Sequence, residues 1–264
     1  MALKTWDAYA LRYATAQRRR LENFIAHDLH DEASSMDYFV WFLRSGDDTI
    51  LVDTGFGVEA ARARKRTFLR CPIDALQSAG IRLEDVKDTV ITHAHYDHAG
   101  NLRKLPQTSF HLQEREMAFA TGKDMRHAFM RRAYDPSDVS DLVYANFEER
   151  LAFHEGAYEL RPGITVHWVG GHTRGLQIVR VHTRRGWIVL ASDASHYLEN
   201  LRKRSPFPIV ADTGDMLRAY ELVETLADSP DHIIAGHDPV TTRLYQAAGP
   251  DGLEIYSLTD PVQS

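Results

Sequence analysis

The sequence predicts an α/β (α+β) fold in which short buried strands run into polar turns and alternate with helices. The hexapeptide His93–His98 follows the strand-like run Asp88–Thr92 and overlaps the start of a predicted helix at Asp97. Three later apolar segments end at or near a residue that can bind metal, these being His172, Asp193 and His237. Sites in layered α/β proteins usually lie at the carboxyl ends of strands, so we expect these residues to share one edge of the fold.

The first ninety residues predict three strands, then a helix, then a further strand. Trp6–Ala14 is expected to be an edge strand, and Tyr38–Leu43 followed by Thr49–Val52 predicts a hairpin because a Gly-Asp turn separates the two runs. Pro72 at a first helical turn, with apolar residues on one face and Gly80 after them, predicts a helix. This helix precedes the strand that leads into the hexapeptide.

The segment after the hexapeptide predicts a strand at Thr108–Leu112 and a short helix at Glu114–Ala120. The composition then changes over residues 121–155, which are rich in charges and aromatic residues and carry a helix-start signal at Pro136. We interpret this stretch as a helical insertion over the site, where substrate selectivity is expected. A structural helical pair with its aromatic residues in the core is an equally good interpretation for any one residue there.

The second half returns to strands, followed by one amphipathic helix. Strands are expected at Ile164–Val169, Leu176–Val181, Trp187–Ala191 and Ile233–Ala235. Apolar residues recur at helical spacing between Gly214 and Ala227, with Thr213 as the expected N-cap. Because no linker, repeat or low-complexity stretch interrupts the chain, residues 1–264 are expected to form a single domain.

Composition limits the classes of function. The 264 residues are 44% hydrophobic and 26% charged, which is typical of an ordinary soluble protein with a substantial core. A formal net charge of -6 gives no support to nucleic-acid or membrane binding as the main activity. We expect the basic runs Arg18–Arg20 and Arg62–Arg66 to be solvated faces or loop charges. The single cysteine, Cys71, excludes an internal disulfide and a multi-cysteine zinc site, so metal ligands must be histidine and carboxylate.

The hexapeptide itself predicts metal binding. It places three imidazoles and one carboxylate in one turn, which is more than one tetrahedral ion needs, so two metals are the economical explanation. A surface turn that happens to be rich in histidine is the alternative. The chain has 14 histidines, and the concentration of three of them in six residues argues against that alternative.

The amino terminus is interrupted by charge at Lys4, Asp7 and Arg12, so it lacks the apolar stretch of a secretory signal. No segment approaches the roughly 20 uninterrupted apolar residues that span a bilayer. A cytoplasmic location is therefore the expectation.

The spacing of these residues resembles that of the metallo-β-lactamase superfamily. The resemblance covers residues 38 to 239 and rests on His-X-His-X-Asp-His, Gly-His-Thr-X-Gly, an aspartate after a strand, and Gly-His-Asp-Pro. It implies a four-layered αβ/βα sandwich with the insertion near 121–155. It also implies seven metal ligands: His93, His95 and His172 on the first ion, Asp97, His98 and His237 on the second, and Asp193 bridging both.

The same resemblance implies hydrolytic chemistry. Two divalent ions can share a hydroxide that attacks a substrate carbonyl, and Asp97 can carry a proton to the leaving group. Asp53 matches the family's outer aspartate, which is expected to orient a liganding histidine by accepting a ring N–H. Zinc is the expected metal, with iron, manganese or cobalt as alternatives.

Within the superfamily the chain is most similar to the dinuclear N-acyl homoserine lactonases, and a lactone is the expected substrate. Those enzymes carry a tyrosine three residues after the bridging aspartate, whereas this chain has His196 there and Tyr197 one residue later. Either residue is a candidate to contact substrate. A cyclic amide, aromatic ester or thioester is the alternative substrate, and a non-catalytic binding protein is a third hypothesis. The expected partners are a small-molecule carbonyl substrate and a second copy in a homodimer.

The remaining histidines are expected to be surface residues or satisfied core residues. They are His27, His30, His111, His127, His154, His167, His182 and His232.

Overall fold

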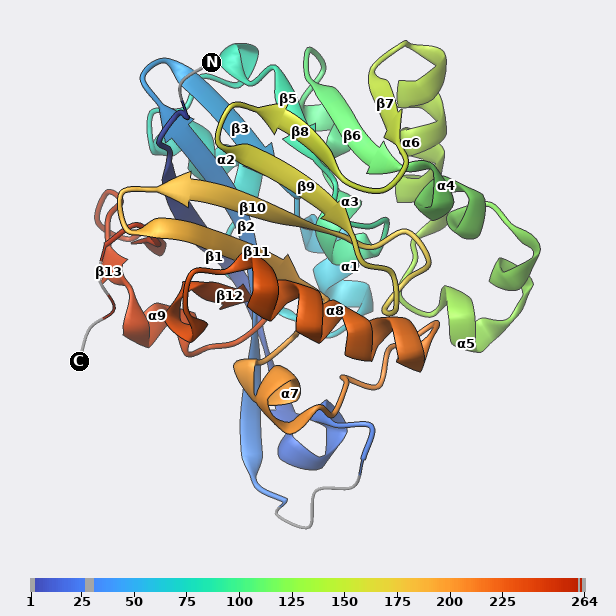
Figure 1. Ribbon diagram of the computed structural model, residues 1–264. Helices are drawn as coiled ribbons and strands as arrows, with labels where there is room; N and C mark the ends of the chain where they lie inside the picture. Colours follow the sequence, from blue (N-terminus) through green and yellow to red (C-terminus); the bar gives the residue numbers. More distant parts are fainter. Residues whose placement is uncertain (1–2, 27–30, 261, 263–264) are drawn as a thin grey trace.

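Two β-sheets face each other and helices cover their outer faces (Figure 1). The structure is a computed structural model that describes residues 3–26, 31–260 and 262. The N-terminal and C-terminal halves of the chain each supply most of one sheet, as the colour gradient in Figure 1 shows. This arrangement confirms the predicted α/β sandwich of the metallo-β-lactamase type.

The larger sheet is mixed. Its strands lie in the order β13-β14-β1-β2-β3-β5-β6-β7, with β4 paired to β1 outside this path. The bounds are β1 Asp7–Arg19, β2 Ala33–Ser45, β3 Asp48–Val52, β4 Thr67–Phe68, β5 Asp88–Val90, β6 Ser109–Gln113, β7 Leu151–His154, β13 Gln246–Ala247 and β14 Ile255–Ser257. Strands β3, β5, β6 and β7 are parallel, so their carboxyl ends meet at one edge.

The smaller sheet has the order β12-β11-β10-β9-β8. Its strands are β8 Tyr158–Arg161, β9 Ile164–Trp168, β10 Gln177–Thr183, β11 Gly186–Ser192 and β12 Ile233–Ala235. Strands β11 and β12 run parallel, so the loops that follow them emerge at the same end of this sheet.

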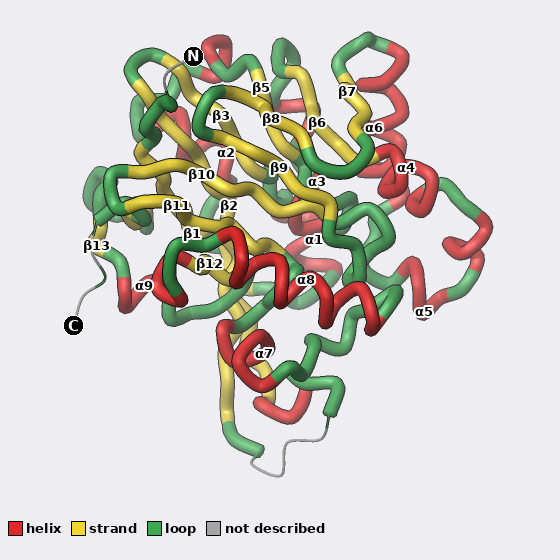
Figure 2. The backbone as a smooth tube through the Cα atoms, in the orientation of Figure 1, coloured by secondary structure: helices red, strands yellow, loops and turns green. Residues whose placement is uncertain are grey.

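Helices flank both sheets, and Figure 2 separates them by colour from strands and loops. The α-helices are α1 Val58–Ala63, α2 Pro72–Ser78, α3 Tyr96–Ala99, α4 Glu114–Ala120, α5 Ala128–Arg131, α6 Pro136–Phe147, α7 Leu198–Lys203, α8 Thr213–Leu226 and α9 Thr241–Leu244. Short 3₁₀ segments are η1 Arg20–Asn23, η2 Leu83–Asp85, η3 Leu102–Lys104, η4 Lys123–Arg126 and η5 Pro230–His232.

Three apolar clusters hold these layers together. Trp6, Trp41 and Val181 belong to the cluster between the two sheets, where both tryptophans are essentially fully buried. Buried aromatic residues each remove about 150–250 Å² from water, so these two contribute strongly to sheet packing. The other clusters lie under the helices on each outer face, and α8 contributes Met216 and Tyr220 to one of them.

Most predicted elements are confirmed, and three differ in position or kind. Strand β1 is internal rather than an edge strand, because β2 pairs with one side of it and β14 and β4 pair with the other. The N-cap of α8 is Asp212, whose side chain accepts from the backbone N–H of Asp215. The predicted insertion is helical through Phe147, but Leu151–His154 is strand β7, because its backbone pairs in parallel with β6.

Within the described part of the chain, none of the helices combines the length and the apolar character that a bilayer span requires.

Candidate metal centre

The loops that leave β5, β9, β11 and β12 bring seven histidine and aspartate side chains together. His93–His98 follows β5 and runs into α3, His172 follows β9, and Asp193 and His237 follow β11 and β12. All seven side chains of the predicted set are at least nine-tenths buried, since none has an exposed fraction above 7%. The structure therefore brings together residues that lie up to 144 positions apart in the sequence.

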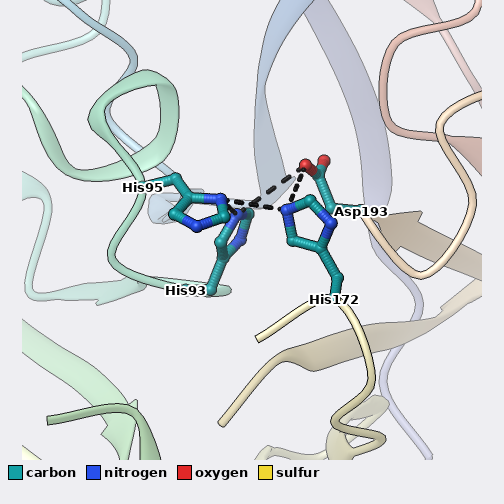
Figure 3. Close-up of side chains that lie close together, drawn as sticks. All are labelled: His93, His95, His172 and Asp193. Carbon is teal, nitrogen blue, oxygen red and sulfur yellow. Dashed lines mark hydrogen bonds and ion pairs between the residues drawn. The ribbon is translucent and has the colours of Figure 1, made fainter. Parts of the chain in front are cut away.

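The first cluster consists of His93, His95, His172 and Asp193, whose polar atoms point toward one another in Figure 3. His95 Nδ1 lies 2.9 Å from His93 Nε2 and 2.9 Å from His172 Nε2. Asp193 Oδ2 lies 3.0 Å from His172 Nε2 and 3.7 Å from His93 Nε2. Four potential ligand atoms thus surround one small space.

The second cluster consists of Asp97, His98 and His237, and it shares Asp193 with the first. Asp193 Oδ1 lies 3.3 Å from His98 Nε2 and 3.0 Å from His237 Nε2. Asp97 Oδ2 is 3.9 Å from His98 Nε2 and 3.8 Å from His237 Nε2. One oxygen of Asp193 therefore faces each cluster, which is the arrangement that a bridging carboxylate needs.

The distances and the unpaired atoms fit bound cations. Ligand atoms of a tetrahedral site with metal bonds of about 2.0–2.1 Å stand roughly 3.3 Å apart. The four contacts given above for the first cluster range from 2.9 to 3.7 Å, and all of its ligand atoms lie within 4.8 Å of one another. In the second cluster the buried atoms His98 Nε2, His237 Nε2 and Asp193 Oδ1 have no hydrogen-bond partner among the described residues. The two nitrogens lie 3.3 and 3.0 Å from Asp193 Oδ1, but none of the three atoms is oriented for a hydrogen bond, and buried polar atoms rarely lack one. A cation bound between them would satisfy all three. Together, the clusters are consistent with a dinuclear site.

Burial and mutual charge set the protonation of these groups. Burial, reinforced by neighbouring imidazoles, holds the pKa of His93 and of His95 well below the usual value, so both rings are neutral and present lone pairs. Burial opposes ionisation of Asp193, but the surrounding histidines hold its pKa well below the usual range. Burial also opposes a charged His98, yet Asp193, Asp53 and Asp97 raise its pKa well above the usual value.

A buried carboxylate behind the second cluster fixes one histidine ring. Asp53 Oδ2 lies 2.7 Å from His98 Nδ1, and the two oxygens of Asp53 also accept from the N–H and the hydroxyl of Thr92. This contact holds the ring so that His98 Nε2 faces Asp193 and Asp97, which is the geometry expected from the sequence. Asp53 adopts a φ of 64°, a left-handed conformation that aspartate and asparagine tolerate better than most residues.

The backbone carbonyl of Asp37 plays the corresponding part for His237. It lies 2.9 Å from His237 Nδ1, so an Nδ1–H donated there leaves Nε2 free to face the clusters. Asp37 and His237 are also joined through their backbones, because Asp37 N–H donates to the His237 carbonyl at 3.0 Å. The β2 strand therefore anchors a ligand that is 200 residues away in the sequence.

Two glycines allow the ligand loops to approach other segments closely. At Gly171, with φ of 87°, an added Cβ would lie 2.5 Å from the backbone nitrogen of Met216. At Gly236, an added Cβ would lie 2.6 Å from the carbonyl oxygen of Ser192. Each glycine directly precedes a histidine of the clusters, so a side chain at either position would displace that histidine.

Glu116 was not singled out by sequence reasoning, yet it holds the site together from α4. It is fully buried, and Oε1 accepts from Ala94 N–H and from the Tyr134 hydroxyl, both at 3.0 Å. Its Oε2 accepts from Gly175 N–H at 3.0 Å. One carboxylate thus ties the hexapeptide loop, the insertion and the loop after His172 to each other. A glutamate in the first turn of a helix carries no sequence signal for this function.

The two candidate substrate residues lie in different environments. The ring of His196 is buried and stacked on Phe207 with centroids 3.8 Å apart, and its Nε2 lies 3.2 Å from Asp193 Oδ2. The hydroxyl of Tyr197 instead donates to the carbonyl of Ser35 at 3.1 Å. The structure therefore brings His196 to the clusters and directs the Tyr197 hydroxyl toward β2.

A cavity of about 190 Å³ opens onto the clusters. Members of both clusters line this cavity, and Met36, Tyr38 and Tyr96 are among its other lining residues. The sequence analysis did not single out Tyr96, whose hydroxyl donates to that of Tyr38 at 3.4 Å. The insertion contributes Arg132 and Ala133 to the lining.

The other histidines lie away from this cavity where the structure describes them. His111, for example, bonds Asp88 at 2.9 Å and His154 at 3.0 Å, which confirms the expectation of a satisfied core histidine. His27 and His30 lie outside the described residues.

Comparisons with known proteins agree with this geometry. A model of the Metallo-beta-lactamase superfamily matches residues 36–237. An N-acyl homoserine lactonase of Bacillus cereus is 24% identical over 245 residues, which are 86% of this chain and 92% of the relative. A probable metallo-hydrolase of Mycobacterium tuberculosis is 24% identical over 220 residues, covering 76% of this chain and 71% of the relative. Among solved structures, the dizinc quorum-quenching lactonase AidC, in complex with a product, has 19% identity and a TM-score of 0.68, and covers 90% of each chain. That similarity shows the fold.

Proposed function

This chain is a metallo-hydrolase that belongs to the metallo-beta-lactamase superfamily, and we propose that it opens a lactone ring of the N-acyl homoserine lactone kind. The observation that carries the proposal is the position of Asp193 between two clusters, with one oxygen toward each. The relatives whose names specify a lactone support the choice of substrate.

We assign the ligands as the sequence predicts. His93, His95, His172 and Oδ2 of Asp193 would hold one cation, and Asp97, His98, His237 and Oδ1 of Asp193 the other. When bound, two divalent cations, which we expect to be zinc, would supply Lewis acidity and lower the pKa of water toward neutrality. Neutral imidazoles and ionised aspartates are the protonation states in which these side chains can act as ligands.

The chain's own residues would orient the substrate and move a proton. Members of both clusters line the cavity, so a lactone carbonyl that enters it would lie against them. Asp97 lines this cavity, so its carboxyl is placed to carry a proton to the ring oxygen that leaves. Of the pair His196 and Tyr197, we assign the contact with a substrate oxygen to His196, because its ring lines the cavity.

A hydrolysis screen tests the proposal. The metal-loaded protein is expected to open acyl homoserine lactones, while chelator-treated protein and Asp97→Asn are inactive but retain the circular dichroism of the native fold. Asp74→Asn is the matched control, because Asp74 pairs with Lys104 at the surface and should keep full activity. If lactones of every acyl length remain closed while the protein hydrolyses another carbonyl compound, the lactone proposal fails.

One observation favours a second candidate, the hydrolysis of a cyclic amide, aromatic ester or thioester. The Tyr197 hydroxyl is bonded to Ser35, so the tyrosine contact expected for a lactonase of this group has no equivalent at that position. The same screen, extended to these compounds, distinguishes the two candidates by which substrate has the higher kcat/KM.

A further inference from the structure

Four arginine side chains line the cavity beside the clusters. We call Arg18, Arg64, Arg66 and Arg132 the arginine rim, since all four line this cavity. The carboxylates that line it are Asp97 and Asp193, and both belong to the proposed metal clusters. Although the chain has a net charge of -6, positive groups outnumber negative ones around this space even before cations bind.

Three members of the rim come from the two basic runs, which were expected to be solvated faces or loop charges and are partly buried here. Arg18 comes from the run at 18–20, and Arg64 and Arg66 come from the run at 62–66, where Arg62 and Lys65 stay exposed. Arg64 and Arg66 lie two positions apart, around the end of α1, and both are half-buried. The local turn therefore points alternate basic residues inward, which composition alone does not reveal.

Arg64 and Arg66 have no carboxylate within 4.0 Å among the described residues. Arg64 donates to the backbone carbonyls of Arg132 and Tyr134 at 2.8 and 3.1 Å, and its guanidinium lies 3.9 Å from the centre of the Tyr96 ring. Arg66 donates through Nε to the Tyr96 hydroxyl at 3.2 Å. Arg64 is satisfied by these carbonyls and this ring, whereas the half-buried Arg66 presents N–H groups beside the cavity with no carboxylate within 4.0 Å among the described residues. This arrangement favours an anionic ligand at Arg66.

Arg66 is the member of the rim best placed to bind that ligand. Its Nε contact with Tyr96 fixes the plane of the guanidinium, while no hydrogen bond of its two Nη groups to another described residue is seen. A planar fork held in this way matches the two oxygens of a carboxylate or phosphate. Tyr96 is itself held by Tyr38, so the fork is positioned before any ligand arrives.

The apolar side of the site offers much less room. Phe119, Phe129 and Met130 line a neighbouring hollow of about 10 Å³, whereas the cavity beside the arginine rim measures about 190 Å³. A hollow of about 10–15 Å³ holds at most a single water, whereas the larger cavity has the volume of about six waters at roughly 30 Å³ each in the liquid. In this conformation a small substrate with a charged substituent fits better than one with a long acyl chain.

We propose that the preferred substrate is a lactone that carries an oxyanion group, carboxylate or phosphate, in place of the neutral acyl amide of an acyl homoserine lactone, and that Arg66 binds this group while the ring is hydrolysed over the two clusters. This inference rests on the proposed hydrolytic function of the same site. Arg66 is then the residue that determines charge selectivity, and Arg18, Arg64 and Arg132 add to the positive field around it.

Matched lactones that differ only in charge test the inference. γ-Carboxy-γ-butyrolactone and its primary amide have nearly the same shape, so their kcat/KM ratio reports charge selectivity. Loss of a hydrogen bond to a charged group corresponds to about 10- to 100-fold in binding, so we expect native protein to prefer the acid by that factor. In Arg66→Gln the ratio should fall to about one through a higher KM for the acid. Arg62→Gln is the matched control from the same basic run, since Arg62 is exposed and pairs with Glu59, and it should keep the native ratio.

A binding measurement keeps the inference separate from catalysis. Valerate, glutarate and γ-phosphonobutyrate share one carboxylate and the same chain and differ at the far end, which is a methyl, carboxylate or phosphonate group. Calorimetry on metal-loaded protein should give tighter binding for glutarate or γ-phosphonobutyrate than for valerate, and Arg66→Gln should abolish the difference. The tighter of the two identifies the oxyanion.

The outcomes are distinct. If neither of these two lactones is hydrolysed, the binding series decides the inference, and the screen with acyl homoserine lactones decides the proposed function. If lactones are hydrolysed but the acid and the amide react equally, or if Arg66→Gln keeps the native selectivity, the inference is overturned and the proposed function stands.

Discussion

Replacing Asp53 by asparagine should weaken metal binding without disturbing the backbone. Asparagine has nearly the same volume and tolerates the φ of 64° found at this position. Its amide oxygen can still accept from Thr92 N–H, but an NH₂ group then faces His98 Nδ1, where the carboxylate oxygen lay 2.7 Å away. The NH₂ group favours the tautomer with hydrogen on Nε2, which cannot bind a cation.

The size of the effect follows from this lost contact. Removing an outer partner of a metal-binding histidine lowers metal affinity by about 10- to 100-fold, which is about 1.4–2.7 kcal/mol. A hydrogen bond to a charged group contributes about 1.5–3 kcal/mol by an independent route, so the two estimates agree. Asp53→Asn should therefore lower the affinity of the second cluster for a metal ion by about 10- to 100-fold, and the metal affinity of the first cluster should change less.

Competition with a chromophoric chelator measures the two affinities. Asp88→Asn is the control, because Asp88 is also a buried partner of a histidine, bonding His111 at 2.9 Å, but lies outside both clusters. That variant should lose stability and keep native metal affinity. Native affinity at both sites in Asp53→Asn, with unchanged circular dichroism, would refute the proposed orientation of His98 by Asp53.

Four further predictions concern stability, pH and activity. Glu116→Gln places an NH₂ group among three hydrogen-bond donors, so urea denaturation should show a free energy of unfolding lower by about 1–3 kcal/mol. An unchanged free energy of unfolding would contradict the tethering role of Glu116. Burial, with Asp135 and Asp141 nearby, raises the pKa of Asp138 to about 7, above its value of 3.8 in an unfolded chain. As pH rises, the unfolded chain loses this proton first, so the contribution of Asp138 to stability is lost between about pH 4 and about pH 7. Asp138→Asn should therefore be more stable than the native protein above about pH 7. Melting temperatures that differ by the same amount at every pH would disprove this. Cations at 100 times their Kd stabilise by about 2.7 kcal/mol per site, so chelation should lower Tm by at least about 5–10 °C, and an unchanged Tm would argue against specific sites. His196→Gln should lower kcat far more than Tyr197→Phe does, because the Tyr197 hydroxyl bonds Ser35; the reverse order would return the catalytic role to Tyr197.

Sequence reasoning predicted the parts of this fold that local pattern controls. The hairpin of β2 and β3, the helix beginning at Pro72 and the strands before His172, Asp193 and His237 follow from periodicity and turn chemistry. The prediction failed where pairing between segments distant in sequence determines whether a segment is a strand and where it lies in the sheet. Strand β1 resembles an edge strand in isolation, and Leu151–His154 becomes a strand only because β6 offers a free edge.

The same division holds for the candidate site. His93, His95 and Asp97 are recognisable because three imidazoles and one carboxylate share one turn, and their convergence with Asp193 is present in the structure. Glu116 and Arg66 were missed because their importance depends on what surrounds them. Glu116 receives three donors from three separate loops, and Arg66 is aimed by Tyr96 rather than by its own neighbours in sequence.

Anomalous X-ray diffraction at the absorption edge of the bound metal tests the dinuclear centre most directly. A crystal of the metal-loaded protein is predicted to show two anomalous peaks, one beside each oxygen of Asp193, with His93, His95 and His172 around one and Asp97, His98 and His237 around the other. A single peak, or two peaks away from Asp193, would contradict the account.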